Sequence, residues 1–268
     1  MSLQAWKAAY SKSSLSNGRK SDSASPMTEY VHKMLLCTIR KCTGCAEAGV
    51  TMSKPTLTIS SKTYSAWSLR GWLLCRLAGL DVELLPVPND ASNRAELLLL
   101  SPSVLVPRLT HNGMSVWDTL AIAETLNEMF PKAGMFPSDP VARAHCRAIC
   151  GEIHSGFSNL RSALPMNLKV RHTKFPIFSG ARPDIERIET IWQDCLSRHG
   201  GPFLFGARPT AADAMYAPVT HRFLTYAVAL SPESADCCET ITAWAPMAEW
   251  ITAAQAEPED MEELDVEF

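Results

Sequence analysis

The stretch TLTISSKTYSAWSLRGWLLCRLAGL, residues 56–80, decides the fold because it passes directly from strand composition to helix composition. Residues 56–59 alternate threonine with leucine and isoleucine, as β-strands often do. A helix is indicated by apolar residues at steps of three and four, namely Leu69, Trp72, Leu73, Leu77 and Leu80. The serine-rich residues 60–65 are therefore predicted to form a turn that leads straight into this helix.

A helix that begins at such a turn is a potential anion site. Its first backbone N–H groups have no partner within the helix, and they lie at the positive end of the helix dipole. An anion held there is stabilised, and the hydroxyl of Ser65 or Ser68 can add a further donor. The simpler interpretation is that one of these serines only caps the helix.

The segment YSAWSLRGWLL, residues 64–74, resembles the start of serine-type glutathione transferases. The resemblance is strongest to the bacterial group that carries YSSWSLRPWLL and more distant to the zeta class with its SSxSxR motif. It extends from Lys54 to Trp250. It implies an α/β plus all-α fold class, in which a thioredoxin-like, glutathione-binding domain at residues 54–132 precedes an all-helical domain at residues 140–256.

This resemblance assigns the catalytic role to Ser65, which aligns with the activating serine of the zeta-class motif. The neighbouring serine of the bacterial group is replaced here by Ala66, and Ser68 is the alternative hydroxyl. Trp67 is expected to border the glutathione sulfur. A hydrogen bond from the serine, together with the helix N-terminus, would lower the pKa of the glutathione thiol, and the thiolate is the nucleophilic form.

Two strand-like segments, SVLVPRL and HNGMSVW, occupy residues 103–117 and are joined through Asn112-Gly113, a pair typical of hairpin turns. In the thioredoxin-like fold that the resemblance implies, a proline at the position of Pro107 follows a cis peptide bond. The backbone of Val106 is then expected to pair with the cysteinyl residue of glutathione. From the residues alone, a trans proline at a strand edge is equally consistent.

A third motif, VWDTLAI at residues 116–122, places Asp118 and Thr119 at the predicted start of another helix. Thr119 could clasp a carboxylate with its hydroxyl and backbone N–H, while Asp118 could meet an ammonium group. The γ-glutamyl end of glutathione carries both charges on one carbon. The family dipeptide is usually Glu-Ser, so Asp-Thr is a conservative departure; without the resemblance, Asp118 would be a plain helix cap.

The remaining pattern predicts a second strand at residues 82–85, parallel to the first, and a short helix at residues 92–100. After a turn-rich linker at residues 131–140, strand patterns end. Helices are then predicted at residues 141–168, 184–198, 211–230 and 245–254. Thr210 and Asp213 fit a capping box, which is a folding signal rather than a catalytic one.

Residues 152–167 are similar to a segment of the bacterial transferases that lines the cleft facing the first domain. Phe157 and Met166 are expected to form an apolar wall for the second substrate. His154 and Arg161 would orient a polar or anionic group of that substrate. Without the resemblance, a single His or Arg on such a helix is more often a structural residue.

These residues together predict a detoxifying transferase that ionises glutathione for attack on a small hydrophobic electrophile, with glutathione as co-substrate and no separate cofactor or metal. Two alternatives stay open: a zeta-like cis–trans isomerase, and a non-catalytic glutathione-binding or regulatory protein on the same scaffold. A thiol–disulfide oxidoreductase is disfavoured because the predicted first helix begins without a cysteine. A serine hydrolase is disfavoured because no G-x-S-x-G surrounds Ser65.

Composition narrows the partners of this 268-residue chain. The net charge of −3 argues against nucleic-acid binding, which normally requires a basic surface. The sequence contains no run of eighteen apolar residues, so no membrane span is expected. Nine cysteines, an odd number, without an apolar secretory signal favour a reducing compartment, so we expect a cytoplasmic protein. The resemblance alone implies a homodimer.

The two ends of the chain differ from the rest. Residues 1–53 are predicted to be a mostly disordered extension of the chain. It is either an extension of the reading frame upstream of a start at Met52 or a targeting leader. The leader is suggested by the basic composition of residues 1–50, which carry seven Lys or Arg and three Asp or Glu. Cys37, Cys42 and Cys45 have a spacing that suits a metal cluster, but a fourth ligand is missing nearby. Residues 257–268, which are strongly acidic, are predicted to be a solvated tail.

Overall fold

The computed structural model describes residues 54–87 and 105–258. Three sequence predictions lie outside these ranges: the N-terminal extension, the role of its three cysteines, and the helix at residues 92–100. Most of the acidic tail also lies outside them.

The first part of the fold is a four-stranded mixed sheet, with strands β1 (Thr56–Ile59), β2 (Glu83–Pro86), β3 (Arg108–His111) and β4 (Met114–Trp117). The strand order is β2-β1-β3-β4. As predicted, β1 and β2 pair in parallel, and β3 and β4 form an antiparallel hairpin. This topology confirms the thioredoxin-like sheet.

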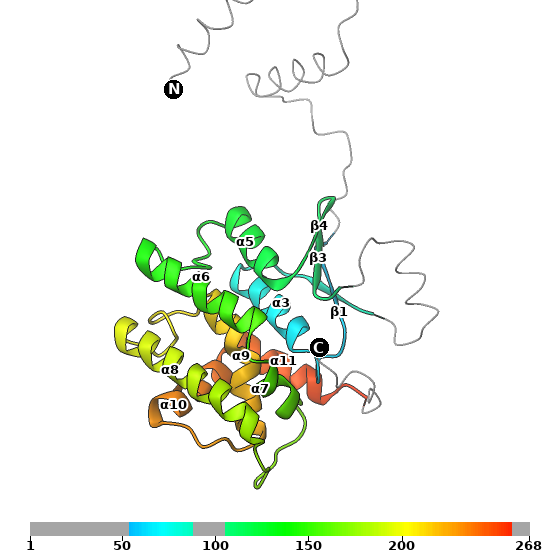
Figure 1. The fold of residues 1–268 in the computed structure, drawn as a ribbon. Helices are drawn as coiled ribbons and strands as arrows, with labels where there is room; N and C mark the ends of the chain where they lie inside the picture. Colours follow the sequence, from blue (N-terminus) through cyan, green and yellow to red (C-terminus); the bar gives the residue numbers. More distant parts are fainter. Residues whose placement is uncertain (1–53, 88–104, 259–268) are drawn as a thin grey trace, which may run out of the picture. The chain divides into compact units, whose positions relative to one another are not determined.

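Helices α3 (Ala66–Leu77) and α5 (Thr119–Met129) lie between this sheet and the remaining helices (Figure 1). The sequence predicted an amphipathic first helix, but α3 is buried on every side from Ser68 to Cys75. It packs on β1 in one direction and on the later helices α9 and α11 in the other. Its one buried charged side chain, Arg70, donates from Nε to the carbonyl oxygen of Met215 at 2.7 Å.

Gly71 allows α3 to approach the loop before β3. A Cβ at this position would lie 2.5 Å from the Cβ of Pro107, a distance at which one of the two backbones must move. The glycine therefore lets the proline loop rest directly on the helix, which sets the position of Val106 beside the helix N-terminus.

Gly71→Ala is expected to destabilise the protein by about 1–3 kcal/mol, the usual cost of overpacking a tight core. The same displacement of Pro107 should weaken glutathione binding. Thermal unfolding and a glutathione titration measure the two effects. Gly151→Ala is the matched control, because a Cβ on that helical glycine meets nothing within 4 Å. Unchanged stability in Gly71→Ala would contradict the close packing.

The second part of the fold is helical and contains α6 (Pro140–Ser155), α7 (Ser158–Ala163), the 3-10 turn η1 (Ser179–Ala181), α8 (Arg182–His199), α9 (Ala211–Thr225), α10 (Pro232–Ala243) and α11 (Ala245–Gln255). Figure 1 shows these helices packed below and beside α3 and α5. In the described ranges, none of the helices is long and apolar enough to cross a membrane.

The helix predictions differ from the structure in three places: one helix is interrupted, the helix predicted at residues 211–230 ends at Thr225, and one helix was missed. The single helix predicted at residues 141–168 is interrupted at Gly156, where a Cβ would lie 2.7 Å from the Glu152 carbonyl oxygen, and at Phe157, whose φ is 62°. Helix α10 was missed altogether. The sequence does contain the signals for its start, a serine followed by a proline. Ser231 caps the helix by accepting from the Ser234 backbone N–H, and Pro232 occupies the first turn.

Helix α9 is the central element of the helical part, and every residue from Ala211 to Phe223 is buried. The predicted capping box at its start is confirmed. The Asp213 carboxylate accepts from the backbone N–H of Thr210 at 2.7 Å and from that of Leu204 at 2.9 Å. These bonds tie the start of α9 to the preceding loop.

One continuous core joins the sheet side and the helical side, because α9 packs on α3 as well as on α6 and α10. Trp72 of α3 and Trp250 of α11 meet across this junction with ring centroids 5.2 Å apart. The two parts of the fold therefore share one core. The domain boundary near residues 131–140 stays a prediction.

Candidate active site

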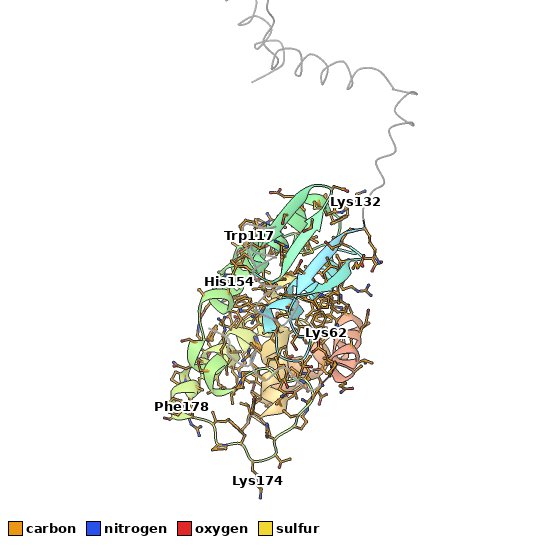
Figure 2. The ribbon with its side chains drawn as sticks, turned by 90° about the vertical axis from the view of Figure 1, so that its right-hand side faces the viewer. Lys62, Trp117, Lys132, His154, Lys174 and Phe178 are labelled. Carbon is orange, nitrogen blue, oxygen red and sulfur yellow. The ribbon has the colours of Figure 1, made fainter. Side chains whose placement is uncertain are left out.

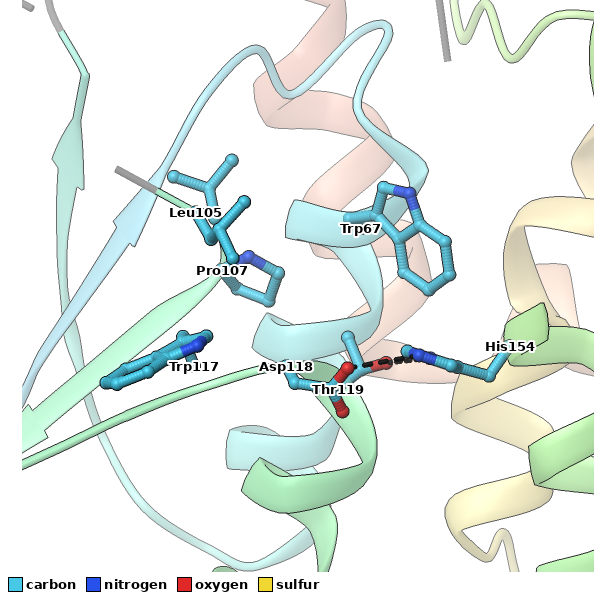
Figure 3. A pocket seen from close by; sticks show the side chains of 8 residues that line it. Trp67, Leu105, Pro107, Trp117, Asp118, Thr119 and His154 are labelled. Carbon is cyan, nitrogen blue, oxygen red and sulfur yellow. Dashed lines mark hydrogen bonds and ion pairs between the residues drawn. The ribbon is translucent and has the colours of Figure 1, made fainter. Parts of the chain in front are cut away.

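A cavity of about 290 Å³ opens where the first turn of α3, the loop before β3, the start of α5 and the end of α6 meet. Its size is at the lower end of the range for small-molecule sites. It is lined by Trp67, Leu105, Val106, Pro107, Trp117, Asp118, Thr119 and His154 (Figure 3). All five residues that were predicted to contact glutathione besides the catalytic serine line this one cavity.

The loop before β3 has the backbone geometry that the resemblance implied. The peptide bond between Val106 and Pro107 is cis. Pro107 is buried against α3, whereas Val106 is partly exposed and lines the cavity. A peptide laid along this loop could pair with the Val106 backbone as one strand pairs with another.

Asp118 caps α5 and adopts an unusual backbone conformation. Its Oδ1 accepts from the N–H of Leu120 at 2.8 Å and from that of Ala121 at 3.2 Å. Its φ is 72°, a region that non-glycine residues rarely visit and that is concentrated at binding sites. The other carboxylate oxygen, Oδ2, faces His154.

His154 links the end of α6 to the start of α5. Its Nε2 lies 3.0 Å from Asp118 Oδ2, and its Nδ1 lies 3.3 Å from Thr119 Oγ1 (dashed in Figure 3). The sequence predicted that His154 would contact the electrophile. The structure places it on the wall of the cavity, beside the residues predicted to hold the γ-glutamyl group, where it contacts the Asp118 carboxylate and the buried Thr119 hydroxyl.

Trp67 forms one wall of the cavity, and two arginine side chains lie over its ring. The guanidinium carbon of Arg70 lies 4.4 Å from its ring centroid, and that of Arg161 lies 5.0 Å away. The His154 ring meets it edge-on at 5.1 Å. The two guanidinium groups hold the indole in place, because positive groups are attracted to its electron-rich face, and the His154 ring adds an edge-on aromatic contact.

Three residues predicted to contact the electrophile are not among the residues that line the cavity. Arg161 donates from Nη2 to the carbonyl oxygens of Ile153 and His154, so that it caps the end of α6. Phe157 and Met166 are buried, with 8% and 1% of their surfaces exposed. Their apolar side chains belong to the core in this structure, and the Trp67, Leu105 and Trp117 side chains supply the apolar wall.

Ser65 is the N-cap of α3 and accepts from the Ser68 backbone N–H at 3.2 Å. It is partly exposed, two residues before Trp67, and does not itself line the cavity. Capping uses a lone pair of the oxygen and leaves the hydroxyl proton available for donation. The alternative hydroxyl, that of Ser68, is fully buried and is not among the groups that line the cavity; its Oγ accepts from the Ser60 backbone N–H at 3.1 Å.

The turn before α3 already holds an anion of the chain itself, which sequence reasoning missed. The Glu257 carboxylate accepts from the backbone N–H groups of Lys62 and Thr63, each at 2.9 Å. Burial acts to raise the pKa of Glu257, but these hydrogen bonds outweigh it and lower the pKa. Glu257 was predicted to begin a solvated tail. No local pattern could reveal this contact, because about 195 residues separate the two partners.

The described cysteines, Cys75, Cys146, Cys150, Cys195, Cys237 and Cys238, are free and buried. Burial raises the pKa of Cys75 to about 12, and it raises those of Cys195 and Cys238 to about 12. Such thiols stay protonated at neutral pH and are poor nucleophiles. Among the described residues, no group of three or more His, Cys, Asp or Glu could hold a metal ion.

Family comparison agrees with this geometry. Residues 64–129 match the glutathione S-transferase N-terminal domain, and residues 171–253 match the glutathione S-transferase C-terminal domain; the two matches together cover more than half of the chain. The chain belongs to the glutathione S-transferase family. The fold described above is therefore the glutathione transferase fold, with the thioredoxin-like part first.

The curated relatives of this transferase include proteins named as isomerases. It is 26% identical over 181 residues to a probable maleylacetoacetate isomerase of Caenorhabditis elegans. The aligned region covers 67% of this chain and 83% of the relative. It is 27% identical over 183 residues to maleylacetoacetate isomerase of Rattus norvegicus, with 67% and 82% covered.

Solved structures share the fold at lower identity. A glutathione transferase homologue from Burkholderia GL BGR1 with bound glutathione superposes with a TM-score of 0.57 and 22% identity, covering 76% of this chain and 99% of the other. Maleylacetoacetate isomerase from Anaeromyxobacter dehalogenans 2CP-1 gives 0.55 and 24%, covering 78% and 97%.

Proposed function

We propose that this protein is a glutathione transferase that binds glutathione in the cavity beside α3, ionises its thiol and directs the thiolate at a small electrophile. The observation that carries the proposal is that three separate motifs converge on one cavity. These are the cis Val106–Pro107 loop, the Asp118-Thr119 start of α5 and the N-terminus of α3 that bears Trp67.

The γ-glutamyl group fits the start of α5. Asp118 supplies a carboxylate for the ammonium group, and Thr119 supplies a hydroxyl at the positive end of the α5 dipole for the carboxylate. His154 holds both side chains from the opposite wall. The cysteinyl residue would then lie along Val106, which directs its sulfur toward the α3 N-terminus and Ser65.

Thiol ionisation follows from the position of Ser65. A free thiol with a pKa near 8.5 is only about 3% thiolate at pH 7, and lowering this pKa by about two units makes about three-quarters of it thiolate. That change requires about 2.7 kcal/mol of preferential interaction with the anion. One hydroxyl donor and a helix N-terminus together supply energies of this size.

The second substrate is proposed to be small and hydrophobic. Leu105 and Trp117 are 62% and 39% exposed and form the open apolar side of the cavity. No further cofactor is needed, because glutathione itself supplies the nucleophile. We also propose that the protein acts as a cytoplasmic homodimer in detoxification.

A zeta-like cis–trans isomerase is the second candidate, and the relatives named maleylacetoacetate isomerase favour it. The two reactions differ in whether they consume the thiol of glutathione. Conjugation forms a lasting carbon–sulfur bond and consumes glutathione, whereas isomerisation adds the thiolate, rotates the bond and releases glutathione unchanged. Counting free thiol during turnover of a panel of aryl halides, epoxides and unsaturated ketones therefore separates them. A protein that binds glutathione but turns over neither class would be the non-catalytic alternative.

Asp118→Asn tests the γ-glutamyl site. Asparagine also caps helices, so α5 should persist, but the charge that pairs with the ammonium group is lost. Hydrogen bonds to charged groups contribute about 1.5–3 kcal/mol, so the glutathione Kd should rise about 10- to 100-fold while kcat at saturation changes little. Titration calorimetry and steady-state kinetics measure these values.

The matched control for Asp118→Asn is Glu124→Gln on the same helix. Glu124 forms an exposed ion pair with Arg147 at 2.7 Å, so its loss should leave glutathione affinity unchanged. An Asp118→Asn variant with wild-type affinity would remove the γ-glutamyl group from this place in the cavity.

A further inference from the structure

The turn at residues 61–63 is enclosed by the C-terminal segment of the chain. Glu257 Oε2 accepts from Ser61 Oγ at 2.8 Å as well as from the Thr63 N–H, and Oε1 accepts from the Lys62 N–H. Ser61 is fully buried, and Thr63 is 1% exposed. Two backbone donors and one hydroxyl thus converge on a single carboxylate.

Helix α11 and a basic residue complete this enclosure. Trp250 donates from Nε1 to the Lys62 carbonyl oxygen at 3.0 Å, and Thr63 Oγ1 donates to the Ala254 carbonyl oxygen at 3.1 Å. Figure 2 shows Lys62 beside the C-terminal helix, away from Trp117 and His154. The Lys169 ammonium donates to the Glu257 carbonyl oxygen, which fixes the backbone that carries the carboxylate.

The same turn sets the position of Ser65. The Ser65 N–H donates to the Ser61 carbonyl oxygen at 3.3 Å, and the Tyr64 N–H donates to Ser61 Oγ at 3.2 Å. Because Ser61 Oγ also donates to Glu257, one hydroxyl links the C-terminal carboxylate to the backbone just before Ser65. A shift of this turn would therefore move the Ser65 side chain with it.

We propose that Glu257 is a positioning residue that holds the 61–63 turn, and through it Ser65, in place for the glutathione sulfur. This inference rests on the proposed function. A hydrogen bond to a developing thiolate depends on placement to within a few tenths of an ångström, so a donor on an unheld turn loses much of its effect. The C-terminal segment thereby takes part in the chemistry without touching the substrate.

The role predicts a specific pH signature for Glu257→Ala. The pKa of bound glutathione should rise by about one unit, because Ser65 is no longer held at the sulfur. Thiolate, and with it kcat, then falls about threefold at pH 7 and about eightfold at pH 6, and it recovers above pH 9. The KM for glutathione should change less than about threefold, since the Asp118 and Thr119 contacts are intact. Ultraviolet absorbance of the thiolate and pH–rate profiles measure both quantities.

Two further variants make the comparison specific. Glu257→Gln keeps an oxygen that accepts from the turn, so its thiol pKa should lie between those of the wild type and Glu257→Ala. Glu249→Ala is the matched control on the same C-terminal segment. Glu249 pairs with Arg76 at 3.0 Å, at the other end of α3, and its loss should leave the pH profile unchanged.

Amide hydrogen exchange provides an independent measure that does not involve glutathione. Faster exchange of the Lys62 and Thr63 amides in Glu257→Ala, with the α9 amides unchanged, would support the role. If the thiol pKa of bound glutathione in Glu257→Ala equals that of the wild type, the positioning role is wrong. The role is also wrong if this pKa falls in both Glu257 variants, because the carboxylate would then act only by repelling the thiolate. If the proposed function itself is wrong, the wild type will show no bound thiolate, whatever the variants do.

Discussion

Ser65→Ala is expected to retain glutathione affinity but to lose most of the bound thiolate at neutral pH. Removal of the hydroxyl should raise the pKa of the bound thiol toward about 8.5, with the helix N-terminus still in place, so that the thiolate fraction at pH 7 falls from about three-quarters toward a limit of about 3%, a loss of at most about 25-fold. Ultraviolet titration of the thiolate and kcat at saturating glutathione measure the loss. The affinity should persist because the proposed γ-glutamyl and cysteinyl contacts lie on α5 and on the loop before β3.

The pH dependence separates this chemical effect from a folding effect. At pH 9 the thiol of Ser65→Ala ionises without assistance, so its kcat should approach that of the wild type. The helix also loses its cap, which costs about 1 kcal/mol of stability. Ser231→Ala is the matched control, because Ser231 caps α10 in the same way and lies outside the cavity. It should lose similar stability and no thiolate.

A Ser65→Ala variant that titrates like the wild type would remove Ser65 from the mechanism. Ser68 is fully buried and does not line the cavity, so we do not expect it to replace Ser65 as the donor. The N–H groups at the start of α3 would then be the main source of thiolate stabilisation.

The sequence predicted those parts of the site whose signals are local. Pro107, Asp118 and Thr119 each lie within a short motif at a helix start or a strand, and the structure brings them to one cavity. The capping box at Thr210 and Asp213 and the hairpin turn at Asn112-Gly113 were readable for the same reason. In each case a few neighbouring residues contain the whole signal.

Contacts between distant segments were not readable. The contact of His154 with Asp118 and Thr119 was not predicted, because it depends on how α6 packs on α5. Glu257 looked like part of a solvated run of acids, although it binds a turn almost two hundred residues earlier. The apolar residues Phe157 and Met166 fitted a cleft wall as well as a core, and only packing decides between these.

Asp213→Ala is expected to cause the largest loss of stability. The carboxylate is fully buried and accepts from the N–H groups of Leu204 and Thr210 and from the Thr210 hydroxyl at 3.0 Å. Its removal leaves buried donors without partners at the start of the central helix, and each costs about 1–3 kcal/mol. A total loss of about 3–4 kcal/mol should lower Tm by about 10 °C. Thermal and denaturant unfolding measure it.

Asp139→Ala is the control for this variant. Asp139 caps α6 by accepting from the exposed Ala142 N–H at 2.7 Å, so its removal exposes the donor to water and should cost about 1 kcal/mol. Equal losses in the two variants would contradict the claim that burial of the Asp213 contacts sets their cost.

The stability difference between wild type and Asp213→Ala should also depend on pH. Burial raises the pKa of Asp213 to about 6, against the hydrogen bonds that lower it. The folded state therefore binds this proton more tightly than the unfolded chain, whose carboxyl has a pKa of about 3.9. Stability from this group is then fully present below about pH 4 and decreases as pH rises through about 6. Asp213→Ala lacks this pH-dependent contribution, so the difference in the free energy of unfolding between wild type and variant should be larger at pH 4 than at pH 7. A larger difference at pH 7 would mean that the hydrogen bonds outweigh burial and lower the pKa of Asp213.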